Sequence, residues 1–433
     1  MIWNPAAETM DRAGIEAVQL DRLQKIVAHA YERVPFYRKK MDERGVRPEH
    51  IKALKDIELL DFTVKNDLRD NYPYGLFAVP MDDVVRIHAS SGTTGRPIVA
   101  GYTAQDLANW TECVARLATA GGVTKRDIAQ VSFGYGLFTG AFGLHQGLEK
   151  IGATIVPISS GNTERQIMLM RDFGSTVLIA TPSYAMYLAE VAEKMDMIGE
   201  IKLRVGLFGA EASTKAMRKE LERRWGILAT ENYGLTEILG PGVSGECEHK
   251  CGMHINEDFF LCEIIDPETG RALPPGEPGE MVITTLTKWA MPILRYRTRD
   301  ITRILPEKCA CGRTSYRMEQ CKGRTDDMLI IRGVNLFPST IEGVLVGAEG
   351  ASPNYEIHVT RENYLDRIEV RVEIDDRFNI DDFQEIERLR KSVMAKLRSV
   401  CQLEIPVRFV SPGSLKRFEG KARRVTDLRD QTN

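Results

Sequence analysis

The sequence lacks a long apolar segment, a secretion signal and an excess of charge of one sign. No stretch approaches the roughly 20 apolar residues that cross a bilayer. The first residues, MIWNPAAETMDRAG, place no basic region before an apolar run, as a signal peptide would. With 58 basic and 61 acidic residues the net charge is −3, so we expect neither a nucleic acid nor a membrane as partner. These absences predict a cytoplasmic protein.

Internal repeats, low-complexity segments and the P-loop pattern GxxxxGK[ST] are also missing, which excludes the P-loop as a route to nucleotide binding. Cysteine is present at eight positions, but a disulfide framework is not expected in so long a chain without a secretion signal. The apolar and charged fractions are those of a globular protein. A chain of 433 residues exceeds one ordinary core, so two or three domains are expected.

The order of the expected elements predicts an α/β fold. Residues 12–70 have helical periodicity, and a short β-branched run at 84–89 follows them. Further along, short apolar strands alternate with amphipathic helices, and the strands are expected at 128–133, 153–158, 176–180, 204–209 and 227–232. This alternation is typical of a doubly wound, mainly parallel sheet, in which ligands bind at the carboxyl ends of the strands.

Two further regions follow the alternating segment. A β-rich antiparallel subdomain is expected at about residues 255–320, where the helical pattern disappears between Pro/Gly/Asp turns. Beyond it, a helix beginning at Pro338, strands near 354–359 and 366–374, and a charged helix from about 381 to 400 indicate a small α+β domain. We therefore expect an N-terminal domain of residues 1–325 and a C-terminal domain of residues 326–433.

Four polar stretches carry possible chemistry. The loop SSGTTG at 90–95 is either a Ser/Gly linker or a nest of backbone N–H groups for phosphate. In ATENYGLTEI at 229–238, Thr236 and Glu237 are either a Mg²⁺–phosphate pair or a strand-to-helix turn, and alone the turn is favoured. Asp300 either accepts hydrogen bonds from sugar hydroxyls or pairs with Arg297 or Arg299. Lys421, beside a glycine near the C-terminus, alone indicates only a solvated side chain.

Taken together and in this order, the stretches resemble the motifs of the adenylate-forming superfamily of acyl-CoA synthetases. SSGTTGRP is similar to its phosphate loop, NYGLTE to its Tyr-Gly-x-[ST]-Glu motif, and YRTRD to its ribose-binding segment. GRTDDMLIIRGVNLFPSTIE is similar to its hinge and EGKARRV to its terminal lysine motif. FGYGLFTGAFGLHQG, TLTKWAMPILRYRTRD and DDMLIIRGVNLFPS further resemble the phenylacetate–CoA ligase family, from about residue 10 to the end.

The resemblance implies a two-step, AMP-forming ligase. ATP and Mg²⁺ would convert phenylacetate or a related aryl acid into an acyl-adenylate and pyrophosphate, and coenzyme A would then take the acyl group as a thioester, as in phenylacetate catabolism. Because carboxylate and phosphate repel each other, charge neutralisation and positioning should supply most of the catalysis. Two alternatives stay open: another acceptor, such as a carrier-protein thiol or an amine, or a non-catalytic nucleotide-binding scaffold. A homodimer and a mobile C-terminal domain are also implied.

The motif matches assign roles residue by residue. Lys421 would bridge the carboxylate and the α-phosphate, Thr236 would contact the α-phosphate, and Glu237 would ligate Mg²⁺. The remaining nucleotide-binding set is Ser90, Ser91, Gly92, Thr93, Thr94, Gly95 and Arg96 at the phosphates, Gly209, Ala210, Glu211 and Tyr233 around the adenine, Asp300 at the ribose, and Asn232, Gly234 and Arg324. Arg96 keeps a cation where the family usually has lysine. Arg299 stands where the family often has glycine.

The same resemblance places the acid pocket and the hinge. Tyr135, Gly136, Phe138 and Gly140 would line the acid pocket, although they could also be core residues of a strand–loop–helix unit. Asp326 would be the hinge. Arg332, Gly333 and Val334 would approach the thioester site in the second half-reaction, because a glycine lets backbone come close to a ligand.

Two cysteine clusters suggest a structural Zn²⁺ site. ECEHKCGMHINED and KCACGRT supply thiols and imidazoles that can form a closed tetrahedral site, although the spacing is not that of a zinc finger. We choose Cys247, His254, Cys309 and Cys311 as ligands. Cys251 or His249 could replace His254, and free thiols in turns are the alternative.

Overall fold

The computed structural model describes residues 1–90, 97–211, 213–325, 327–331, 334–362 and 365–429. The chain divides into two compact units. The first unit comprises Met1–Ala180, Glu200–Ala210 and Thr230–Gln320, and the second comprises Thr181–Gly199, Glu211–Ala229 and Cys321–Asn433. Among the helices described, none combines the length and the apolar character that crossing a membrane requires.

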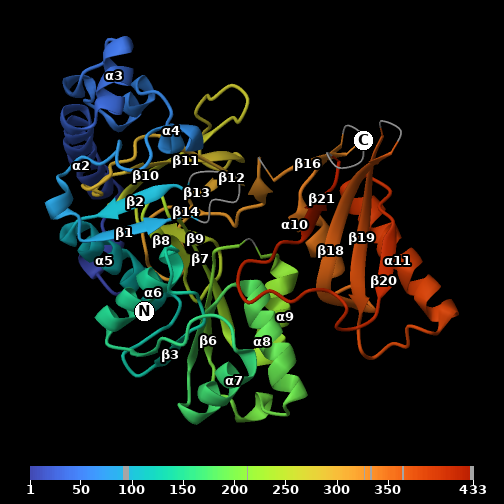
Figure 1. Ribbon diagram of the computed structural model, residues 1–433. Coiled ribbons are helices and arrows are strands. Elements are labelled where there is room, and N and C mark those ends of the chain that lie inside the picture. The colour runs from blue at the N-terminus through green and yellow to red at the C-terminus, as the bar shows by residue number, and fades with distance from the viewer. Residues whose placement is uncertain (91–96, 212, 326, 332–333, 363–364, 430–433) are drawn as a thin grey trace. The chain divides into compact units, whose positions relative to one another are not determined.

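A nine-stranded sheet forms the centre of the first unit (Figure 1). Its order is β13 (Ile304–Leu305), β14 (Arg317–Met318), β9 (Met253–Ile255), β8 (Gly240–Glu246), β7 (Leu228–Leu235), β6 (Val205–Phe208), β5 (Val177–Ala180), β3 (Ile128–Val131) and β4 (Thr154–Val156). Strands β4, β3, β5 and β6 are parallel to one another, as the alternating pattern predicts. From β7 to β13 the pairing is antiparallel, an extension that the local pattern did not indicate.

Two helices cover one face of this sheet. Helix α5 (Ala104–Ala120) is capped by Thr103, whose hydroxyl accepts a hydrogen bond from the Asp106 N–H in a capping box. Helix α6 (Thr139–Ile151) packs against α5, and both contact β8. The two helices come close because α6 carries glycine at the contact: a Cβ on Gly147 would lie 2.3 Å from the Val114 side chain. Helix α7 (Thr163–Asp172) follows β4.

The remaining elements of the first unit are an antiparallel sheet, a strand pair and the N-terminal helices. Strands β10 (Phe260–Ile265), β11 (Gly279–Thr285) and β12 (Tyr296–Thr302) form the predicted antiparallel subdomain. Strands β1 (Arg86–Ala89) and β2 (Val99–Tyr102) form a separate antiparallel pair. The N-terminal region contains α1 (Pro5–Glu8), α2 (Arg12–Arg33), α3 (Pro35–Glu43), η1 (Pro48–His50), η2 (Leu54–Leu59), α4 (Lys65–Asp70) and η3 (Met81–Asp83). The helical prediction for residues 12–70 agrees with these bounds.

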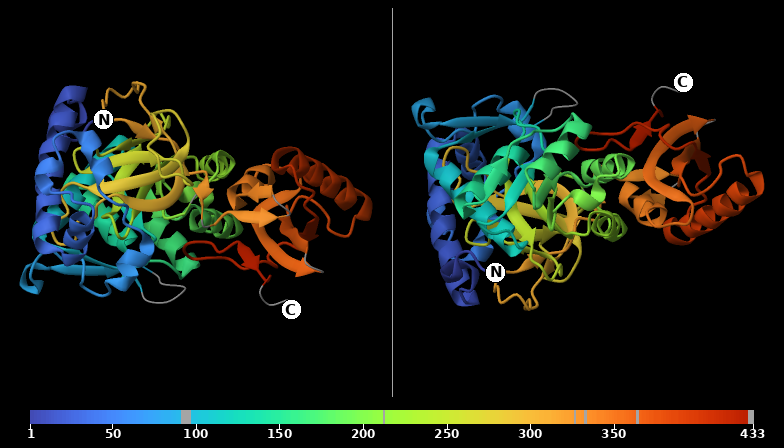
Figure 2. Two further views of the ribbon diagram at one scale, coloured as in Figure 1. Left: turned by 90° about the horizontal axis from the view of Figure 1, so that it is seen from above. Right: turned by 90° about the horizontal axis from the view of Figure 1, so that it is seen from below.

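The second unit contains a smaller sheet of order β20 (Val407–Val410), β19 (Leu365–Ile374), β18 (Ala351–Glu362) and β21 (Val425–Asp427). Helices α10 (Pro338–Leu345) and α11 (Phe383–Cys401) pack against it and share its apolar core (Figure 2). The unit also holds α8 (Pro182–Lys194), α9 (Lys215–Trp225), β15 (Gly323–Arg324), β16 (Leu329–Ile331) and β17 (Val334–Leu336), while η4 (Ile198–Glu200) ends at its boundary. The predicted α+β elements after Pro338 are all present, and the domain boundary at 325/326 stays a prediction.

Candidate active site

The turn that carries Thr236 and Glu237 reverses the chain between β7 and β8. Leu235 pairs with Gly240, and Gly234 pairs with Pro241 in an antiparallel register. A Cβ on Gly234 would lie 1.8 Å from the Gly240 carbonyl oxygen, so a side chain cannot fit there. The interpretation of this stretch as a strand-to-helix turn is therefore wrong: a strand follows the turn. The turn presents its polar residues at the carboxyl end of β7.

Glu237 is buried and is fixed by two neighbours. The Tyr296 hydroxyl on β12 donates a 2.6 Å hydrogen bond to Oε1 of Glu237, and the Lys288 ammonium donates a 2.8 Å bond to the Glu237 carbonyl oxygen. The neighbouring Thr236 hydroxyl lies 3.2 Å from the hydroxyl of Thr139, at the start of α6. One carboxylate and two hydroxyls are thus held together, a donor set that suits Mg²⁺ and a phosphate oxygen.

Lys288 is a fully buried cation beneath this turn. Its burial lowers the pKa of the ammonium to about 8, although the nearby carboxylates of Asp106 and Glu237 oppose the shift. The ammonium also lies 5.0 Å from the centroid of the Tyr102 ring. The Tyr102 hydroxyl donates a 3.0 Å hydrogen bond to the Leu239 carbonyl, and burial raises the pKa of Tyr102. Lys288 and Tyr102 thus hold the backbone of the turn in place through hydrogen bonds to its carbonyl groups.

Asp300 is held by a tyrosine and not by an arginine. The Tyr233 hydroxyl on β7 donates a 2.6 Å hydrogen bond to Oδ2 of Asp300 on β12. Arg297 and Arg299 project from the opposite face of β12, where both contact Glu280. Among the residues that the structure describes, neither arginine contacts Asp300, so the ion-pair alternative for this carboxylate is wrong. Asp300 and Tyr233 form one polar pair between the two strands.

The phosphate-loop segment connects two paired strands. The Ser90 N–H donates a 2.9 Å hydrogen bond to the Ile98 carbonyl, and the Ile98 N–H donates a 3.1 Å bond to Oγ of Ser90. Both ends of the stretch are thus held in this hairpin, and the choice between a linker and a phosphate nest stays a matter of prediction. The other predicted residues of the loop, Ser91, Gly92, Thr93, Thr94, Gly95 and Arg96, lie outside the described residues.

The predicted adenine segment follows β6. Gly209 lies against Asn232: an added Cβ would come within 2.8 Å of the Asn232 carbonyl oxygen, and the Asn232 amide donates a 2.8 Å hydrogen bond to the Phe208 carbonyl. Ala210 adopts a left-handed backbone with φ of 70°. Glu211 belongs to the second unit, where its carboxylate accepts hydrogen bonds from the N–H groups of Ser183 and Ala422. Its side chain is thus engaged with backbone of that unit.

The predicted acid-pocket residues lie between β3 and α6. The Tyr135 hydroxyl is 3.0 Å from Nδ1 of His145, and burial raises the pKa of Tyr135. The Phe138 ring is partly exposed and covers Gly140, where a Cβ would meet it at 2.4 Å. Nothing lies within 4 Å of the position of a Cβ on Gly136. The Leu137 carbonyl accepts a hydrogen bond from the Ala89 N–H, so this loop lies beside the start of the phosphate loop.

The predicted hinge and coenzyme A residues belong to the second unit. Arg324 lies in β15, and its Nε is 3.7 Å from Oδ2 of Asp327. Val334 is the first residue of β17. Asp326, Arg332 and Gly333 lie outside the described residues, so their roles stay predictions.

The predicted metal ligands gather in one cluster. The ligand atoms of Cys247, His254, Cys309 and Cys311 all lie within 4.8 Å of one another. The Cys247 and Cys309 sulfurs are 3.7 Å apart, and the Cys311 sulfur is 3.3 Å from Nε2 of His254. Three thiolates with one imidazole at such separations suit a tetrahedral Zn²⁺ site. Of the open alternatives, His249 is exposed, whereas the Cys251 sulfur lies 3.3 Å from that of Cys309.

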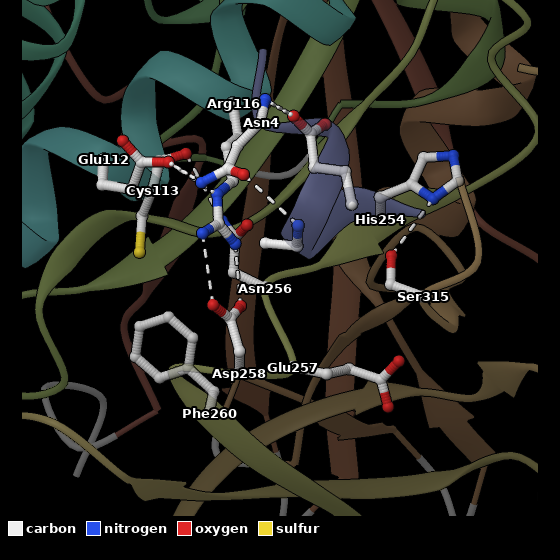
Figure 3. A network of polar contacts seen from close by, with 12 residues as sticks. Asn4, Glu112, Cys113, Arg116, His254, Asn256, Glu257, Asp258, Phe260 and Ser315 are labelled. Atoms are coloured by element: carbon white, nitrogen blue, oxygen red, sulfur yellow. Dashed lines mark hydrogen bonds and ion pairs between the residues drawn. The ribbon is translucent and has the colours of Figure 1, made fainter. Parts of the chain in front are cut away.

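Neighbouring polar groups orient His254 of this cluster (Figure 3). Oγ of Ser315 lies 3.4 Å from Nδ1 of His254, which leaves Nε2 directed at the thiols. On the adjoining loop, the N-terminal segment binds the hairpin that carries two of the cysteines, because Nε of Arg313 donates a 2.5 Å hydrogen bond to Glu8. Nearby, Arg116 forms a two-point ion pair with Asp258. The cluster is thus tied to the first residues of the chain.

Sequence reasoning missed four side chains around the Glu237 turn, namely Tyr102, Thr139, Lys288 and Tyr296. Two of them had a signal in the sequence. Lys288 is the one charged residue of the stretch TLTKWAMPIL, whose run of apolar residues from Trp289 to Leu294 indicates a buried segment. Tyr296 has the same parity as Asp300 on one strand, so both side chains lie on the same face. Tyr102 and Thr139 reach the turn through tertiary packing alone.

The chain is similar over its whole length to known ligases. Residues 16–287 match the family model of AMP-binding enzymes, and residues 333–429 match the AMP-binding enzyme C-terminal domain. The phenylacetate-coenzyme A ligase of Thermus thermophilus is 47% identical, with 99% of this chain and 100% of that protein covered. The ligase of the same name from Escherichia coli is 47% identical, with 99% of each chain covered.

A solved structure shares the fold. It is 2-hydroxyisobutyryl-CoA ligase in the postadenylation state with 2-HIB-AMP, which is 29% identical and has a TM-score of 0.94, with 99% of this chain and 93% of that chain covered. The same ligase in complex with 2-HIB-AMP and CoA in the thioesterification state has a TM-score of 0.74 at 30% identity. The chain therefore belongs to the family of AMP-binding enzymes and, within it, groups with the phenylacetate–coenzyme A ligases.

Proposed function

We propose that the protein is an AMP-forming ligase that converts phenylacetate or a related aryl acid into its coenzyme A thioester. The observation that carries the proposal is the similarity over nearly the full chain to phenylacetate-coenzyme A ligases at 47% identity. The site geometry supports it, because the polar residues of the nucleotide motifs occupy adjacent turns and strands of the first unit. The reaction would serve phenylacetate catabolism in the cytoplasm.

In the first half-reaction, a carboxylate oxygen of the acid attacks the α-phosphorus of ATP. The new O–P bond forms as the bond to the β-phosphate oxygen breaks, and pyrophosphate leaves. Two anions meet in this step, so positive charge and fixed donors lower the barrier. Lys421 supplies a compact cation between the carboxylate and the α-phosphate, and Thr236 donates to an α-phosphate oxygen. Asp300, whose carboxylate accepts a hydrogen bond from Tyr233, binds the ribose hydroxyls.

The Glu237 carboxylate suits Mg²⁺, which is typical of this family. Hard oxygen ligands and substrate phosphates are what Mg²⁺ prefers, and the ion would neutralise phosphate charge. Tyr296 and Lys288 keep the Glu237 side chain and backbone in place. The loop of residues 90–96 would hold the β- and γ-phosphates through backbone N–H groups, with Arg96 as its cation.

In the second half-reaction, the thiolate of coenzyme A attacks the carbonyl carbon of the acyl-adenylate, and AMP leaves. A two-state cycle is supported by the related 2-hydroxyisobutyryl-CoA ligase, whose structures are described in a postadenylation and a thioesterification state. Residues 332–334 would approach the thioester site after a movement at Asp326, with residues 1–325 and 326–433 as the two working domains.

Two further features belong to the proposal. The cluster of Cys247, His254, Cys309 and Cys311 would hold a structural Zn²⁺, which would fix the segment of residues 309–315 on the body of the unit. The Tyr135 loop, which lies beside the phosphate-loop hairpin, supplies the aromatic wall of the acid pocket. A homodimer is the expected assembly.

A panel of aryl, indolyl and aliphatic acids, assayed with ATP, Mg²⁺ and coenzyme A, tests the proposed function. We expect arylacetic acids to give thioester, AMP and pyrophosphate with the highest kcat/KM. If turnover does not depend on coenzyme A but continues with an amine or a carrier-protein thiol, that amine or thiol is the acceptor in place of coenzyme A. No acid-dependent pyrophosphate release with any acid would leave only a nucleotide-binding scaffold.

A further inference from the structure

The peptide groups on both sides of Lys421 are held by side chains of the second unit. The Thr181 hydroxyl donates a 3.0 Å hydrogen bond to the Gly420 carbonyl, which belongs to the peptide group before Lys421. The Glu211 carboxylate accepts a 2.8 Å hydrogen bond from the Ala422 N–H, which belongs to the peptide group after it. The other oxygen of Glu211 accepts a 2.6 Å bond from the Ser183 N–H.

A third anchor lies four residues before Lys421. The Arg417 guanidinium binds Glu190 on α8 at 3.0 and 3.1 Å, and it also binds Glu373 on β19 at 2.8 and 2.7 Å. Figure 1 shows this segment between β20 and β21 passing beside α8 and α9. Charge-assisted, two-point bonds of this kind are roughly twice as strong as hydrogen bonds between neutral groups.

The Lys421 side chain itself is exposed, and its ammonium forms no hydrogen bond or ion pair with any residue that the structure describes. The chain thus fixes the backbone of Lys421 on both sides while it leaves the cation unpaired. A long, flexible lysine has many conformations, and fixing its Cα removes part of the entropy that would otherwise be lost when the ammonium binds a ligand.

We propose that Thr181 and Glu211 are positioning residues that hold Lys421 for adenylation, and that the ion pair of Arg417 with Glu190 stabilises the same arrangement. The inference rests on the adenylation role of Lys421 proposed above. It also changes the interpretation of Glu211, whose carboxylate acts on the backbone beside Lys421 and not on the adenine. Thr181, Glu211 and Glu190 touch no reacting atom, so their effect is transmitted through Lys421.

This assignment predicts an effect on one half-reaction only. If the loop serves adenylation, its anchors contribute nothing to transfer of the acyl group from a finished adenylate. Weakening an anchor should therefore lower the rate of adenylation and leave thioester formation from supplied acyl-adenylate unchanged or faster. A purely structural defect would lower both rates together.

The test measures both half-reactions in the full-length protein. Adenylation is followed by acid-dependent ATP–pyrophosphate exchange, and thioester formation by adding synthetic phenylacetyl-adenylate and coenzyme A. The variants are Thr181→Val, which removes the hydroxyl, Thr181→Ser, which restores it, and Glu190→Gln, which weakens the ion pair with Arg417. Lys421→Ala is the reference for complete loss of the cation.

Two matched controls separate positioning from stability. Thr181 also caps α8, because its hydroxyl accepts a hydrogen bond from the Tyr184 N–H. Thr214 caps α9 in the same way through the Met217 N–H, so Thr214→Val loses a cap of the same kind away from the loop. Lys194→Met removes the other ion pair of Glu190 and leaves Arg417 unchanged.

We expect Thr181→Val and Glu190→Gln to lower the kcat of adenylation about tenfold, which is the factor that one lost hydrogen bond or partly buried ion pair corresponds to. Thr181→Ser and both controls should keep the wild-type ratio of the two half-reactions. Equal loss of both half-reactions in Thr181→Val, or no loss in either anchor variant while Lys421→Ala abolishes adenylation, would overturn the positioning role alone. Unchanged adenylation in Lys421→Ala would overturn the proposed role of Lys421 as well.

Discussion

The Tyr296 hydroxyl donates a 2.6 Å hydrogen bond to the Glu237 carboxylate, and both side chains are buried. The bond joins the first residue of β12 to the turn between β7 and β8. A carboxylate that is to bind Mg²⁺ needs its own orientation fixed, since a free side chain would lose conformational entropy on binding. The buried tyrosine supplies that restraint before any ligand arrives.

Tyr296→Phe should therefore weaken the use of Mg²⁺ in adenylation. The loss of a hydrogen bond to a charged group predicts a fall in kcat/KM of about 10- to 100-fold at limiting Mg²⁺. The apparent Mg²⁺ affinity, measured from initial rates of ATP–pyrophosphate exchange, checks it.

Tyr37→Phe is the matched control for that variant. The Tyr37 hydroxyl is also buried and accepts a 3.2 Å hydrogen bond from the Leu294 N–H, away from the turn. It should lower stability without changing the dependence on Mg²⁺. The same Mg²⁺ titration curve for Tyr296→Phe and wild type would contradict the assignment of Glu237.

Asp300, which Tyr233 holds through its hydroxyl, should recognise the ribose. We expect Asp300→Asn to lower the preference for ATP over 2′-deoxyATP about tenfold, because the amide replaces an acceptor that the sugar hydroxyl requires. The ratio of kcat/KM for the two nucleotides measures the preference. If the preference stays at the wild-type value, Asp300 does not recognise the ribose and has a structural role only.

Arg299→Gly serves as the comparison for Asp300→Asn. Arg299 adopts a φ of 69°, a conformation that favours glycine, and its guanidinium contacts Glu280 and not Asp300. The variant should keep the nucleotide preference of the wild type. A change in preference as large as that of Asp300→Asn would show that Arg299 acts on the ribose site.

Because the Lys288 ammonium is buried, we expect the protein to become more stable as the pH rises into the alkaline range. Burial lowers its pKa from 10.5 to about 8, so between these values the unfolded chain keeps a proton that the folded chain has released. The free energy of unfolding should then increase with pH by about 1 kcal/mol per unit over this window, and the gain is absent below pH 8. Urea unfolding at pH 7.5 and 9.5 measures it.

Lys288→Met removes the titrating group and should remove this part of the pH dependence. The difference between wild type and variant isolates Lys288 from the tyrosines and cysteines that titrate in the same range. Parallel pH profiles for the two proteins would mean that the Lys288 ammonium is not destabilised by burial.

The cysteine cluster predicts one Zn²⁺ per chain in protein purified without chelator. Cys309→Ser should lose the metal and unfold at a lower temperature, because structural zinc stabilises the fold that its ligands require. Cys262→Ser is the control: this cysteine is partly buried and lies outside the cluster, so the variant should keep its zinc. Elemental analysis gives the stoichiometry.

Cys251→Ser decides between the alternative ligands. The Cys251 sulfur is close to that of Cys309, but His254 is the residue within the four-atom cluster. The account predicts that Cys251→Ser keeps its zinc and that His254→Ala loses it. The opposite pattern would make Cys251 the fourth ligand.

Local patterns predicted most elements of the fold. Strands β3, β5 and β6 and the helices α10 and α11 lie where the sequence pattern indicates, because each buries one face against a neighbour. The antiparallel half of the large sheet was not predicted. Strand β8 is rich in glycine and pairs with β7 through a tight turn at Gly234, and this pairing has no periodic signal.

The site was predictable where it depends on the strand period and unpredictable where it depends on packing. The period of two separates Asp300 from Arg297 and Arg299, so the sequence contains the answer to that alternative. The role of Glu211 on the Ala422 N–H joins residues 211 positions apart. No local rule brings such residues together, and only the folded second unit shows the contact.

Isotope transfer from the acid to AMP tests the central claim most directly. Phenylacetate labelled with oxygen-18 in its carboxylate is turned over with ATP and coenzyme A, and the AMP is analysed by mass spectrometry. Attack of the carboxylate on the α-phosphorus predicts one labelled oxygen in each AMP formed, together with an equal amount of thioester. Unlabelled AMP, or label in free phosphate, would contradict an acyl-adenylate intermediate.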